Sequence, residues 1–530
     1  MVTSVVSCPG KVLLAGGYLV LDRQHQGFVV STPSRFFTVV DDITQEGNAG
    51  DHQAADERIR LTVRSPQFDD GLWEYEAVQV EGEWTVKEHK KEGVPSETTA
   101  DSRSLDLAAE GLRTDACSHC RGSSNSFVHL SLQATLQLAS ALSPSTPFRS
   151  LDITIDATPI PFAPLNCTIR NVHKTGLGSS AAMVTSLTSS LFLHWTSPSS
   201  PSSSSRLPNP DDGTVQLMHN LAQYVHSLAQ GKVGSGFDVS AAVYGSQVYK
   251  RFDVRCLGDL LGADAARASK PSATDLFDVL SPRRNPSWTA PTTHGSVSTF
   301  SLPPGVLLLL ADVDAGSNTP SMVGKVMAWK KAQPMEAERV WTELGESNER
   351  LREALGALGR RCDEDKAEYE REVDRLAALP AEERPQLTRL RTVQWLDSPL
   401  PFAVAAQHIL TIRSLMRHMG ESSLVPIEPP EQTRLLDACS ALPGVVGAGV
   451  PGAGGYDAIW VLCLSPSSAL APAPVEAVDA LLRSYTAMSV RPLSRSAWVP
   501  GGTEEGERGL LRERIEQVEG LSEAVARGRK

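Results

Sequence analysis

Apolar residues recur along most of the chain with the spacings of strands and helices. Short apolar or alternating runs predict strands at 2–7, 11–15, 27–40, 151–155 and 306–313. Apolar positions three to four residues apart predict helices at 128–142, in the second half of 174–193, and at 215–230, 321–329, 340–358 and 405–418. Pro9-Gly10 predicts a turn between the first two strands, and 444–463 is typical of a glycine loop with a strand.

Three polar stretches interrupt this pattern, and we interpret them as insertions or connections. Residues 41–125 hold few periodic apolar positions, although Trp73-Glu74-Tyr75 and 83–86 predict a hairpin. Residues 197–213 include a Ser/Pro-rich run of low complexity, and residues 265–300 are polar and contain several prolines. We place the boundary between two domains in the last of these stretches.

The length of 530 residues favours two domains, because a single hydrophobic core rarely grows to that size. We predict an N-terminal domain over 1–265 and a C-terminal domain over 300–500. Residues 501–530 are rich in charge, and we expect a tail with a surface helix there.

The charge balance and the cysteines narrow the classes of partner. Asp and Glu total 62 against 50 for Lys and Arg, a net charge of −12, so the chain has no general attraction for nucleic acid. The apolar run 306–311 is too short to span a bilayer and no secretory signal pattern is visible, so we expect a cytoplasmic protein without a membrane partner. The 8 cysteines are expected to be reduced, and we interpret Cys117-x-x-Cys120 as loop cysteines and not as half of a zinc site.

The clearest chemical signal is the glycine- and serine-rich segment 174–182 ahead of a predicted helix. Its glycines let backbone N–H groups approach a ligand, and the free N–H groups at a helix start favour phosphate. A dinucleotide fingerprint fits less well, because Ser/Pro-rich sequence replaces the acid expected about 20 residues later. The P-loop pattern fails because no second glycine followed by lysine stands at its spacing. A plain helix N-cap without a ligand stays open for this segment alone.

Three further segments carry weaker signals. Residues 231–238 form a glycine loop that ends at Asp238, whose carboxylate either orients a nucleophile or caps a helix. Lys11 follows Pro9-Gly10 inside an apolar strand, and a buried ammonium requires an anionic partner such as an Asp or a phosphate. Residues 452–455 predict a tight turn at a hairpin or strand entry, and the strand that follows argues against a dinucleotide site there.

In their order along the chain, these segments resemble the three motifs of the GHMP kinases. The first is Pro9-Gly10-Lys11-x-x-Leu14-Ala15-Gly16-Gly17-Tyr18, the second is 176–182 and the third is 452–455. Three motifs in order are far more specific than any one of them. Within this superfamily the chain most resembles the eukaryotic, fungal-type phosphomevalonate kinases, and the resemblance is carried by residues 15–22, 229–246 and 316–326.

The resemblance implies a two-domain GHMP kinase fold of mixed α/β and α+β class. It implies an N-terminal ribosomal-protein-like α/β domain with a left-handed βαβ crossover, a C-terminal ferredoxin-like domain, and an active site in the cleft between them. It also implies transfer of the γ-phosphoryl group of ATP, with Mg²⁺, to (R)-5-phosphomevalonate in the mevalonate route to isoprenoids and sterols. Monomer and homodimer both stay open.

The resemblance also assigns residues to the site. Lys11 and Asp238 would face the transfer centre, with Asp238 mainly orienting groups and pairing with Lys11. The implied nucleotide contacts are Lys174, Gly176, Leu177, Gly178, Ser179, Ser180, Ala181, Ala182, Gly452, Gly454 and Gly455. The implied substrate contacts are Lys11, Lys232, Ser235, Ser317, Thr319, Ser321 and Lys325. Ser179 and Ser180 are the implied Mg²⁺ ligands.

The chemistry of such a reaction sets a requirement for cations. A phosphate monoester is mostly dianionic at neutral pH, so charge neutralisation matters more than a general base. We therefore expect several cations to converge on the cleft: Lys11, Lys174, Lys232 and Lys325, with Arg251 as a weaker candidate.

The sequence departs from the family pattern at two places. Gly17 stands where mevalonate kinases have an acidic residue. Relatives also carry a Mg²⁺-binding glutamate on the helix before the catalytic Asp. The predicted helix 215–230 has His226, Ser227 and Gln230 but no Glu, so it supplies no carboxylate ligand for the metal. The alternatives that we keep are mevalonate kinase, against which Gly17-Tyr18 and Lys232 argue, and a non-catalytic protein that binds ATP and a metabolite.

Overall fold

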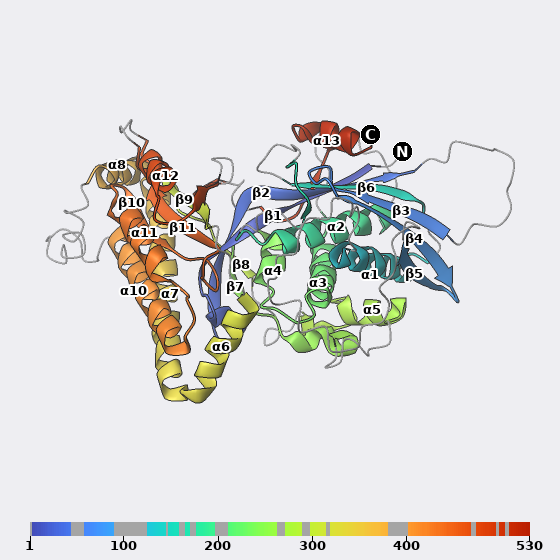
Figure 1. Ribbon diagram of the computed structural model, residues 1–530, viewed down its shortest axis with the longest axis horizontal. Helices are drawn as coiled ribbons and strands as arrows, with labels where there is room; N and C mark the ends of the chain where they lie inside the picture. The colour runs from blue at the N-terminus through green and yellow to red at the C-terminus, as the bar shows by residue number, and fades with distance from the viewer. Residues whose placement is uncertain are drawn as a thin grey trace.

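The computed structural model describes residues 3–43, 58–89, 125–144, 147–157, 165–169, 176–196, 210–261, 271–288, 297–313, 319–379, 401–467, 473–493, 498–503 and 508–529. Two sheets lie in the two halves of an elongated molecule, each with helices packed around it (Figure 1). Within these residues, none of the helices combines the length and the apolar character needed to cross a membrane.

The first sheet has the strand order β14-β1-β2-β6-β3-β4-β5, and β7 pairs with both β2 and β8. The strands are β1 (Thr3–Ala15), β2 (Gln26–Asp42), β3 (Arg58–Arg64), β4 (Leu72–Val80), β5 (Glu83–Glu88), β6 (Leu151–Ala157), β7 (Gln247–Lys250), β8 (Val297–Thr299) and β14 (Leu511–Glu513). Its pairs are antiparallel apart from β3 with β6. One face is covered by α1 (Ser126–Leu142), α2 (Ser179–Thr196), α3 (Asp212–Ala229) and α4 (Phe237–Tyr244), with α5 (Ala273–Leu280) beyond them (Figure 1).

The second sheet is antiparallel and has the order β10-β11-β9-β12, with β13 also paired to β9. Its strands are β9 (Val306–Val313), β10 (Val445–Gly449), β11 (Ala458–Leu464), β12 (Val490–Pro492) and β13 (Val499–Pro500). The helices of this half are α6 (Thr319–Ala332), α7 (Pro334–Glu364), α8 (Lys366–Ala377), α10 (Pro401–Ser423), α11 (Pro430–Ala441) and α12 (Pro474–Ser484).

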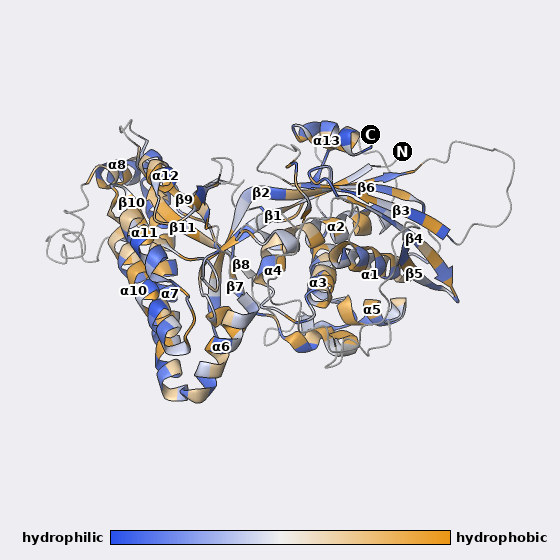
Figure 2. Ribbon diagram, viewed as in Figure 1, coloured by the Kyte–Doolittle hydropathy of each residue, from blue (hydrophilic) through white to orange (hydrophobic). Residues whose placement is uncertain are grey.

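The long helix α7 shows why these segments fold as the periodicity predicts. Leu344, Leu351 and Leu358 recur every seven residues and are all buried, while the intervening polar residues form the outer face. Figure 2 shows the resulting polar and apolar sides of α7 and of its neighbour α10. Burial of this apolar stripe, more than helix propensity, holds the helix in place.

The two halves share a hydrophobic core, and this fixes the position of the first motif. The inner ends of β1 and β2 contribute Val12 and Phe28, which belong to one cluster with Leu308 and Leu462 of the second sheet. Leu177, from the second motif, is part of the same cluster. The segments that carry the motifs therefore lie where the two halves pack together.

The turn predicted at Pro9-Gly10 is wrong, because β1 runs through it. The register between β1 and β2 shifts between Pro9 and Lys11, which is the signature of a bulge. A bulge tolerates proline, which has no N–H to donate, and the neighbouring glycine. An ideal Cβ on Gly10 would lie 2.9 Å from Thr32 Oγ1, so a larger residue has little room there.

Parts of the polar stretches belong to the sheet and its core. The predicted hairpin is confirmed as β4 and β5, and β3 joins it to β6, so 58–88 extend the first sheet. Trp73, Tyr75 and Trp84 are buried against α1 and α2. In the stretch 265–300, Leu276 and Trp288 pack in the core of the N-terminal half. Cys117 and Cys120 lie outside the described residues.

The C-terminal segment contains a helix, as the sequence predicts, but it also adds a strand to the first sheet. β14 pairs with β1, and α13 (Leu521–Gly528) packs Leu521 and Val525 on Val5 and Phe37. α13 lies on the face of the sheet opposite α2 (Figure 1). α13 contacts β6 on that face, and Asp156 of β6 is buried.

Gly509 sets the contact between this segment and α4. An ideal Cβ at Gly509 would overlap the carbonyl oxygen of Val243 and lie 2.6 Å from the nitrogen of Gly245. Gly509→Ala is therefore expected to lower the free energy of unfolding by about 1–3 kcal/mol, measured by urea denaturation. The matched control is Gly359→Ala on α7, where a Cβ meets nothing within 4 Å. That change should raise stability by about 0.5–1 kcal/mol. A Gly509→Ala variant as stable as the parent chain would contradict this contact.

Candidate active site

β1 makes the hydrogen bonds that bring three glycine-rich segments together. The backbone nitrogen of Lys11 donates to the carbonyl of Leu177 at 2.8 Å. Two residues further on, the carbonyl of Leu13 accepts from the nitrogen of Gly452 at 3.3 Å. The Tyr18 hydroxyl then donates to the carbonyl of Ala453 at 2.9 Å. The first motif therefore contacts the second and the third motif directly.

Three of the glycines stand where a side chain would not fit. A Cβ on Gly17 would overlap the carbonyl oxygen of Gly452. A Cβ on Gly178 would lie 2.6 Å from Lys11 Cε, and one on Gly176 would lie 2.9 Å from the Cβ of Ala458. The backbone of the third motif therefore lies directly against the first motif. An acidic residue in place of Gly17 is incompatible with this packing.

The second motif forms the start of α2, as the sequence predicts. Gly178 has a φ of +70°, a left-handed conformation that favours glycine, and α2 begins at the next residue, Ser179. Ser179 and Ser180 are half-buried, while Ala181 and Ala182 are buried in the packing between helices. The serines therefore lie at the accessible end of the helix, where its dipole favours an anion.

Lys11 lies between carboxylates and the second motif. Its Nζ donates to the carbonyl of Gly176 at 3.3 Å and lies 5.2 Å from the centre of the Phe237 ring. Burial lowers the pKa of Lys11, while the negative charges of Asp238 and Asp457 raise it. The Asp238 carboxylate acts on Lys11 through space, and their direct pairing stays a prediction. Asp457, which follows the third motif, was not expected.

Asp238 lies in the first turn of α4, where the helix dipole favours a carboxylate. Its side chain is 24% exposed, which leaves it open to a ligand. The loop ahead of it is braced by Arg251, whose guanidinium donates to the carbonyls of Leu21 at 2.8 Å and Gly234 at 2.7 Å. The Tyr249 hydroxyl donates to the carbonyl of Ser235 at 2.6 Å. Arg251 thus holds the backbone of this loop, and its convergence on the cleft as a weaker cation stays a prediction.

His226 of α3 joins this group and was not assigned a role from the sequence. Its Nε2 lies 3.2 Å from the Ser180 hydroxyl, and its Nδ1 lies 4.0 Å from Asp238 Oδ2. The only signal in the sequence was the lack of a Glu on this helix. Three helices, α2, α3 and α4, therefore each place one polar side chain at the same point.

The remaining predicted site residues are less closely tied to this group. Lys174 and Ser317 lie outside the described residues. Lys232 is exposed on the loop before α4, and Ser235 is half-buried there. Thr319, Ser321 and Lys325 are exposed in the first turns of α6. Their convergence on Lys11 stays a prediction.

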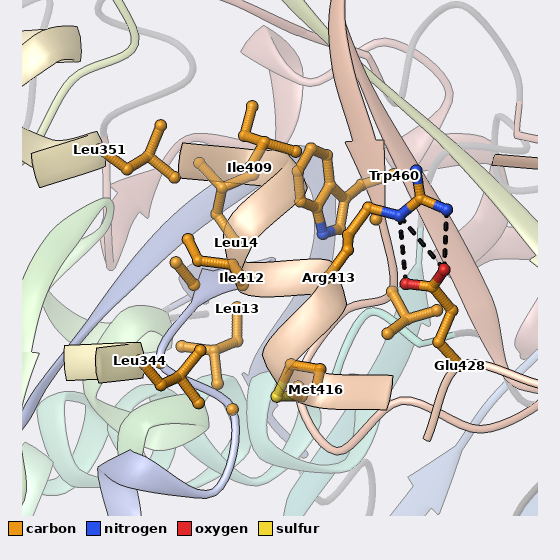
Figure 3. A pocket seen from close by; sticks show the side chains of 16 residues that line it. Leu13, Leu14, Leu344, Leu351, Ile409, Ile412, Arg413, Met416, Glu428 and Trp460 are labelled. Carbon is orange, nitrogen blue, oxygen red and sulfur yellow. Dashed lines mark hydrogen bonds and ion pairs between the residues drawn. The ribbon is translucent and has the colours of Figure 1, made fainter. Parts of the chain in front are cut away.

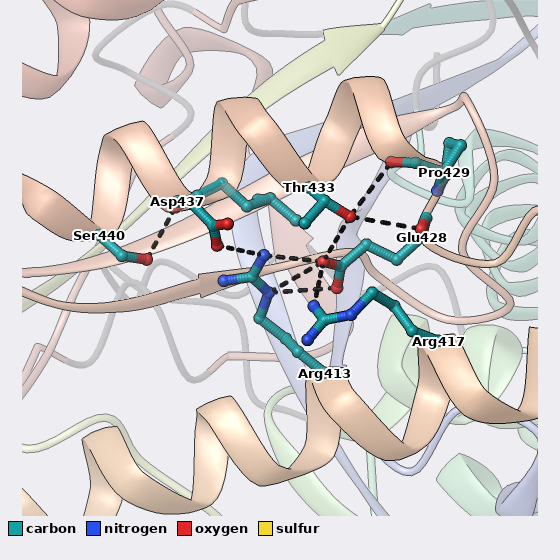
Figure 4. A network of polar contacts seen from close by, with 8 residues as sticks. Arg413, Arg417, Glu428, Pro429, Thr433, Asp437 and Ser440 are labelled. Carbon is teal, nitrogen blue, oxygen red and sulfur yellow. Dashed lines mark hydrogen bonds and ion pairs between the residues drawn. The ribbon is translucent and has the colours of Figure 1, made fainter.

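The third motif is the loop of the β10–β11 hairpin, and it rests on the segment after α10. The nitrogen of Gly455 donates to the carbonyl of Ile427 at 2.8 Å, and a Cβ on Gly454 would overlap that same oxygen. The next residue, Glu428, is fully buried and receives hydrogen bonds from Arg413 and Arg417, both at 2.7 Å (Figure 4). This ion network lies beneath the glycine loop, and the sequence did not predict it.

A small apolar cavity lies below the first and third motifs. Its volume is about 20 Å³, and Leu13, Leu14, Ile412 and Met416 are among the side chains that line it (Figure 3). That volume is enough for about one water molecule, and the charged residues of the lining, Arg413 and Glu428, are already paired with each other. We interpret this cavity as a packing defect between β1, α7 and α10, and not as a ligand site.

Comparisons with known proteins identify the family of this chain. Residues 403–473 match the family model described as the GHMP kinases C terminal. A phosphomevalonate kinase of Aspergillus fumigatus is 35% identical over 501 residues, which cover 87% of this chain and 87% of that protein. The peroxisomal phosphomevalonate kinase of Arabidopsis thaliana is 34% identical, over 87% of this chain and 90% of its own length.

The solved structures show the same fold. The phosphomevalonate kinase of Streptococcus pneumoniae in complex with phosphomevalonate and AMPPNP aligns with a TM-score of 0.51. The alignment covers 93% of this chain and 100% of that chain at 15% identity, so this similarity shows the fold alone. The sequence relatives, which are similar over most of their length, show in addition that this chain belongs to the phosphomevalonate kinase family of the GHMP kinases.

Proposed function

We propose that this protein transfers the γ-phosphoryl group of ATP to (R)-5-phosphomevalonate. The products are ADP and (R)-5-diphosphomevalonate, in the mevalonate route to isoprenoids and sterols. The observation that carries the proposal is that the first motif bonds to the second motif at Lys11 and to the third motif at Leu13. The family supports it, because the relatives are phosphomevalonate kinases and the Streptococcus pneumoniae structure contains phosphomevalonate and AMPPNP.

The residues take the following proposed roles. Lys11 neutralises charge between donor and acceptor, and Asp238 orients the reacting groups, with proton abstraction as a minor role. A phosphate acceptor is already anionic at neutral pH, so it needs little general base. The proposed nucleotide contacts are Lys174, Gly176, Leu177, Gly178, Ser179, Ser180, Ala181 and Ala182, supported by Gly452, Gly454 and Gly455. The proposed acceptor contacts are Lys11, Lys232, Ser235, Ser317, Thr319, Ser321 and Lys325.

The oxygen groups at the start of α2 fit a Mg²⁺ ion that arrives with ATP. In the part of the chain that the structure describes, no group of three His, Cys, Asp or Glu residues could hold a metal by itself. Serine hydroxyls together with phosphate oxygens and water suit Mg²⁺, which keeps several waters. Ser179 and Ser180 would hold the ion, which would neutralise phosphate charge.

The proposal also covers the two domains, the cellular compartment and the partners of the protein. We place the N-terminal domain at 1–265, with insertions at 41–125 and 197–213, and assign to it the ribosomal-protein-like fold with a left-handed βαβ crossover. We place a ferredoxin-like domain at 300–500, and the order β12-β9-β11-β10 supports it. Within 501–530, β14 and α13 belong to the N-terminal half and do not form a separate tail. We further propose that the protein is cytoplasmic, that it is a monomer or a homodimer, and that it has no nucleic acid or membrane partner.

The test is steady-state release of ADP by the purified protein with Mg²⁺-ATP, measured with mevalonate and with 5-phosphomevalonate in separate reactions. Release with 5-phosphomevalonate and at most trace release with mevalonate is the expected result. Gly17 underlies this expectation, since an acidic residue does not fit at this position. Turnover of mevalonate with no turnover of 5-phosphomevalonate would overturn the assignment of the acceptor.

A further inference from the structure

His226 is held where three helices meet beside the proposed transfer centre. Its ring lies between the Ser180 hydroxyl, at 3.2 Å from Nε2, and Asp238 Oδ2, at 4.0 Å from Nδ1. Only 7% of its side chain is exposed. A buried imidazole placed between a candidate metal ligand and a candidate catalytic carboxylate needs an explanation.

The packing next to these three residues makes their arrangement rigid. Ala181 follows Ser180, Val239 follows Asp238, and Ala222 lies one helical turn before His226. These three neighbours are completely buried and form one apolar cluster. The small side chains let α2, α3 and α4 approach closely, and the polar side chains beside them are fixed as a consequence.

The neighbours of the ring favour one tautomer. The Asp238 carboxylate, which can only accept, lies 4.0 Å from Nδ1, so the proton is expected on that nitrogen. Nε2 is then the acceptor for the Ser180 hydroxyl, at 3.2 Å. In a neutral imidazole the proton must be on Nδ1, which faces the Asp238 carboxylate.

We propose that His226 is a positioning residue that sets the orientation of both Ser180 and Asp238. Because the Ser180 hydrogen is directed to Nε2, the lone pairs of its oxygen are turned outward, toward a cation or its water. The Nδ1–H group attracts the Asp238 carboxylate and limits its rotation. This inference rests on the proposed function, because it assigns Ser180 and Asp238 to the transfer site.

The first test is spectroscopic and requires no substrate. The ring nitrogens of His226 are observed by NMR in protein labelled with ¹⁵N-histidine, and the signals are assigned by their loss in His226→Gln. The expected result is a proton on Nδ1 and none on Nε2. A proton on Nε2 would overturn the proposal, whether or not the protein turns over 5-phosphomevalonate.

The second test is kinetic and uses two histidines of the same helix. His226→Phe keeps the ring volume and removes both polar contacts. The expected loss of kcat is about tenfold, the effect of one hydrogen bond in the transition state, with KM for the acceptor within about twofold. His226→Gln, which can still accept and donate, should recover part of this loss.

The control is His219→Phe, because His219 is equally buried on α3 but bonds to Asn220 and Gln223. It should lower the melting temperature as much as His226→Phe does, with kcat within about twofold of the parent chain. Equal losses of kcat in the two variants would show a structural effect and overturn the positioning role. Failure of the parent chain with 5-phosphomevalonate would instead reject the proposed function, and the NMR result would then decide this inference.

Discussion

Lys11→Met is expected to lower kcat/KM for 5-phosphomevalonate by at least about 100-fold, as the loss of one preorganised charge-stabilising group does in other enzymes. Methionine keeps the length and volume of the stem, so the contact with Gly178 and the ring of Phe237 is retained. The variant therefore removes the charge with little change in packing. Steady-state ADP release measures the effect, and thermal melting shows whether the fold is intact.

Two comparisons make this result specific. Lys87→Met changes an exposed lysine on β5, far along the sheet from the motifs, and should leave kcat/KM within about twofold. Asp238→Asn should cost less than Lys11→Met, because an anionic acceptor needs orientation more than proton abstraction. A loss of several orders of magnitude in kcat for Asp238→Asn, with KM unchanged, would make Asp238 a general base. Near-normal turnover by Lys11→Met would remove Lys11 from the site.

Glu428→Gln is expected to lower the free energy of unfolding by about 3–5 kcal/mol, because it leaves a buried arginine without its charge partner. Arg413 is 4% exposed in its side chain and Glu428 is 0% exposed. Arg413 contacts Glu428 through Nε at 3.2 and 3.1 Å and through Nη2 at 2.7 Å, and Thr433 adds a hydrogen bond at 3.1 Å (Figure 4). Asp437 would compensate only in part, at 2.9 Å from Arg413. Urea denaturation followed by fluorescence measures the change.

The matched control is an ion pair of the same kind at the surface. Arg371 and Glu368 on α8 are 2.6 Å apart but 66% and 59% exposed, so Glu368→Gln should leave the denaturation midpoint unchanged. Pairing Glu428→Leu with Arg413→Met should cost less than the sum of the single changes, as expected for groups in contact. Ile427, the residue before Glu428, accepts the hydrogen bond of Gly455, a proposed nucleotide contact. Glu428→Gln should therefore also raise KM for ATP. Stability equal to the parent chain would show that the network is dispensable.

Local pattern was sufficient for most elements and for the motifs. The heptad spacing in α7, the apolar residues of β2 and the apolar run of β9 each correspond to a helix or strand in the structure. The left-handed Gly178 ahead of Ser179 follows from glycine-rich sequence before a helix. Such features depend on residues a few positions apart, which a sequence shows directly.

The errors have a common cause in distant contacts. Pro9-Gly10 has the composition of a turn, but pairing with β2 over the whole of β1 makes it a bulge. The C-terminal segment has the composition of a tail, but β14 finds the open edge of β1. In both places, a partner far away in sequence satisfies backbone groups that local composition would leave to water.

The sequence by itself determined the family, the three glycine-rich segments and the need of Lys11 for an anionic partner. It also determined Asp238 as the candidate for that partner. Only the tertiary structure decided that His226 stands between Ser180 and Asp238, that Asp457 adds a second negative charge near Lys11, and that Arg413 and Glu428 support the third motif. The physical reason is that charge and hydrogen-bond energies depend on distances between side chains, and residues from separate helices and loops come within those distances only after packing.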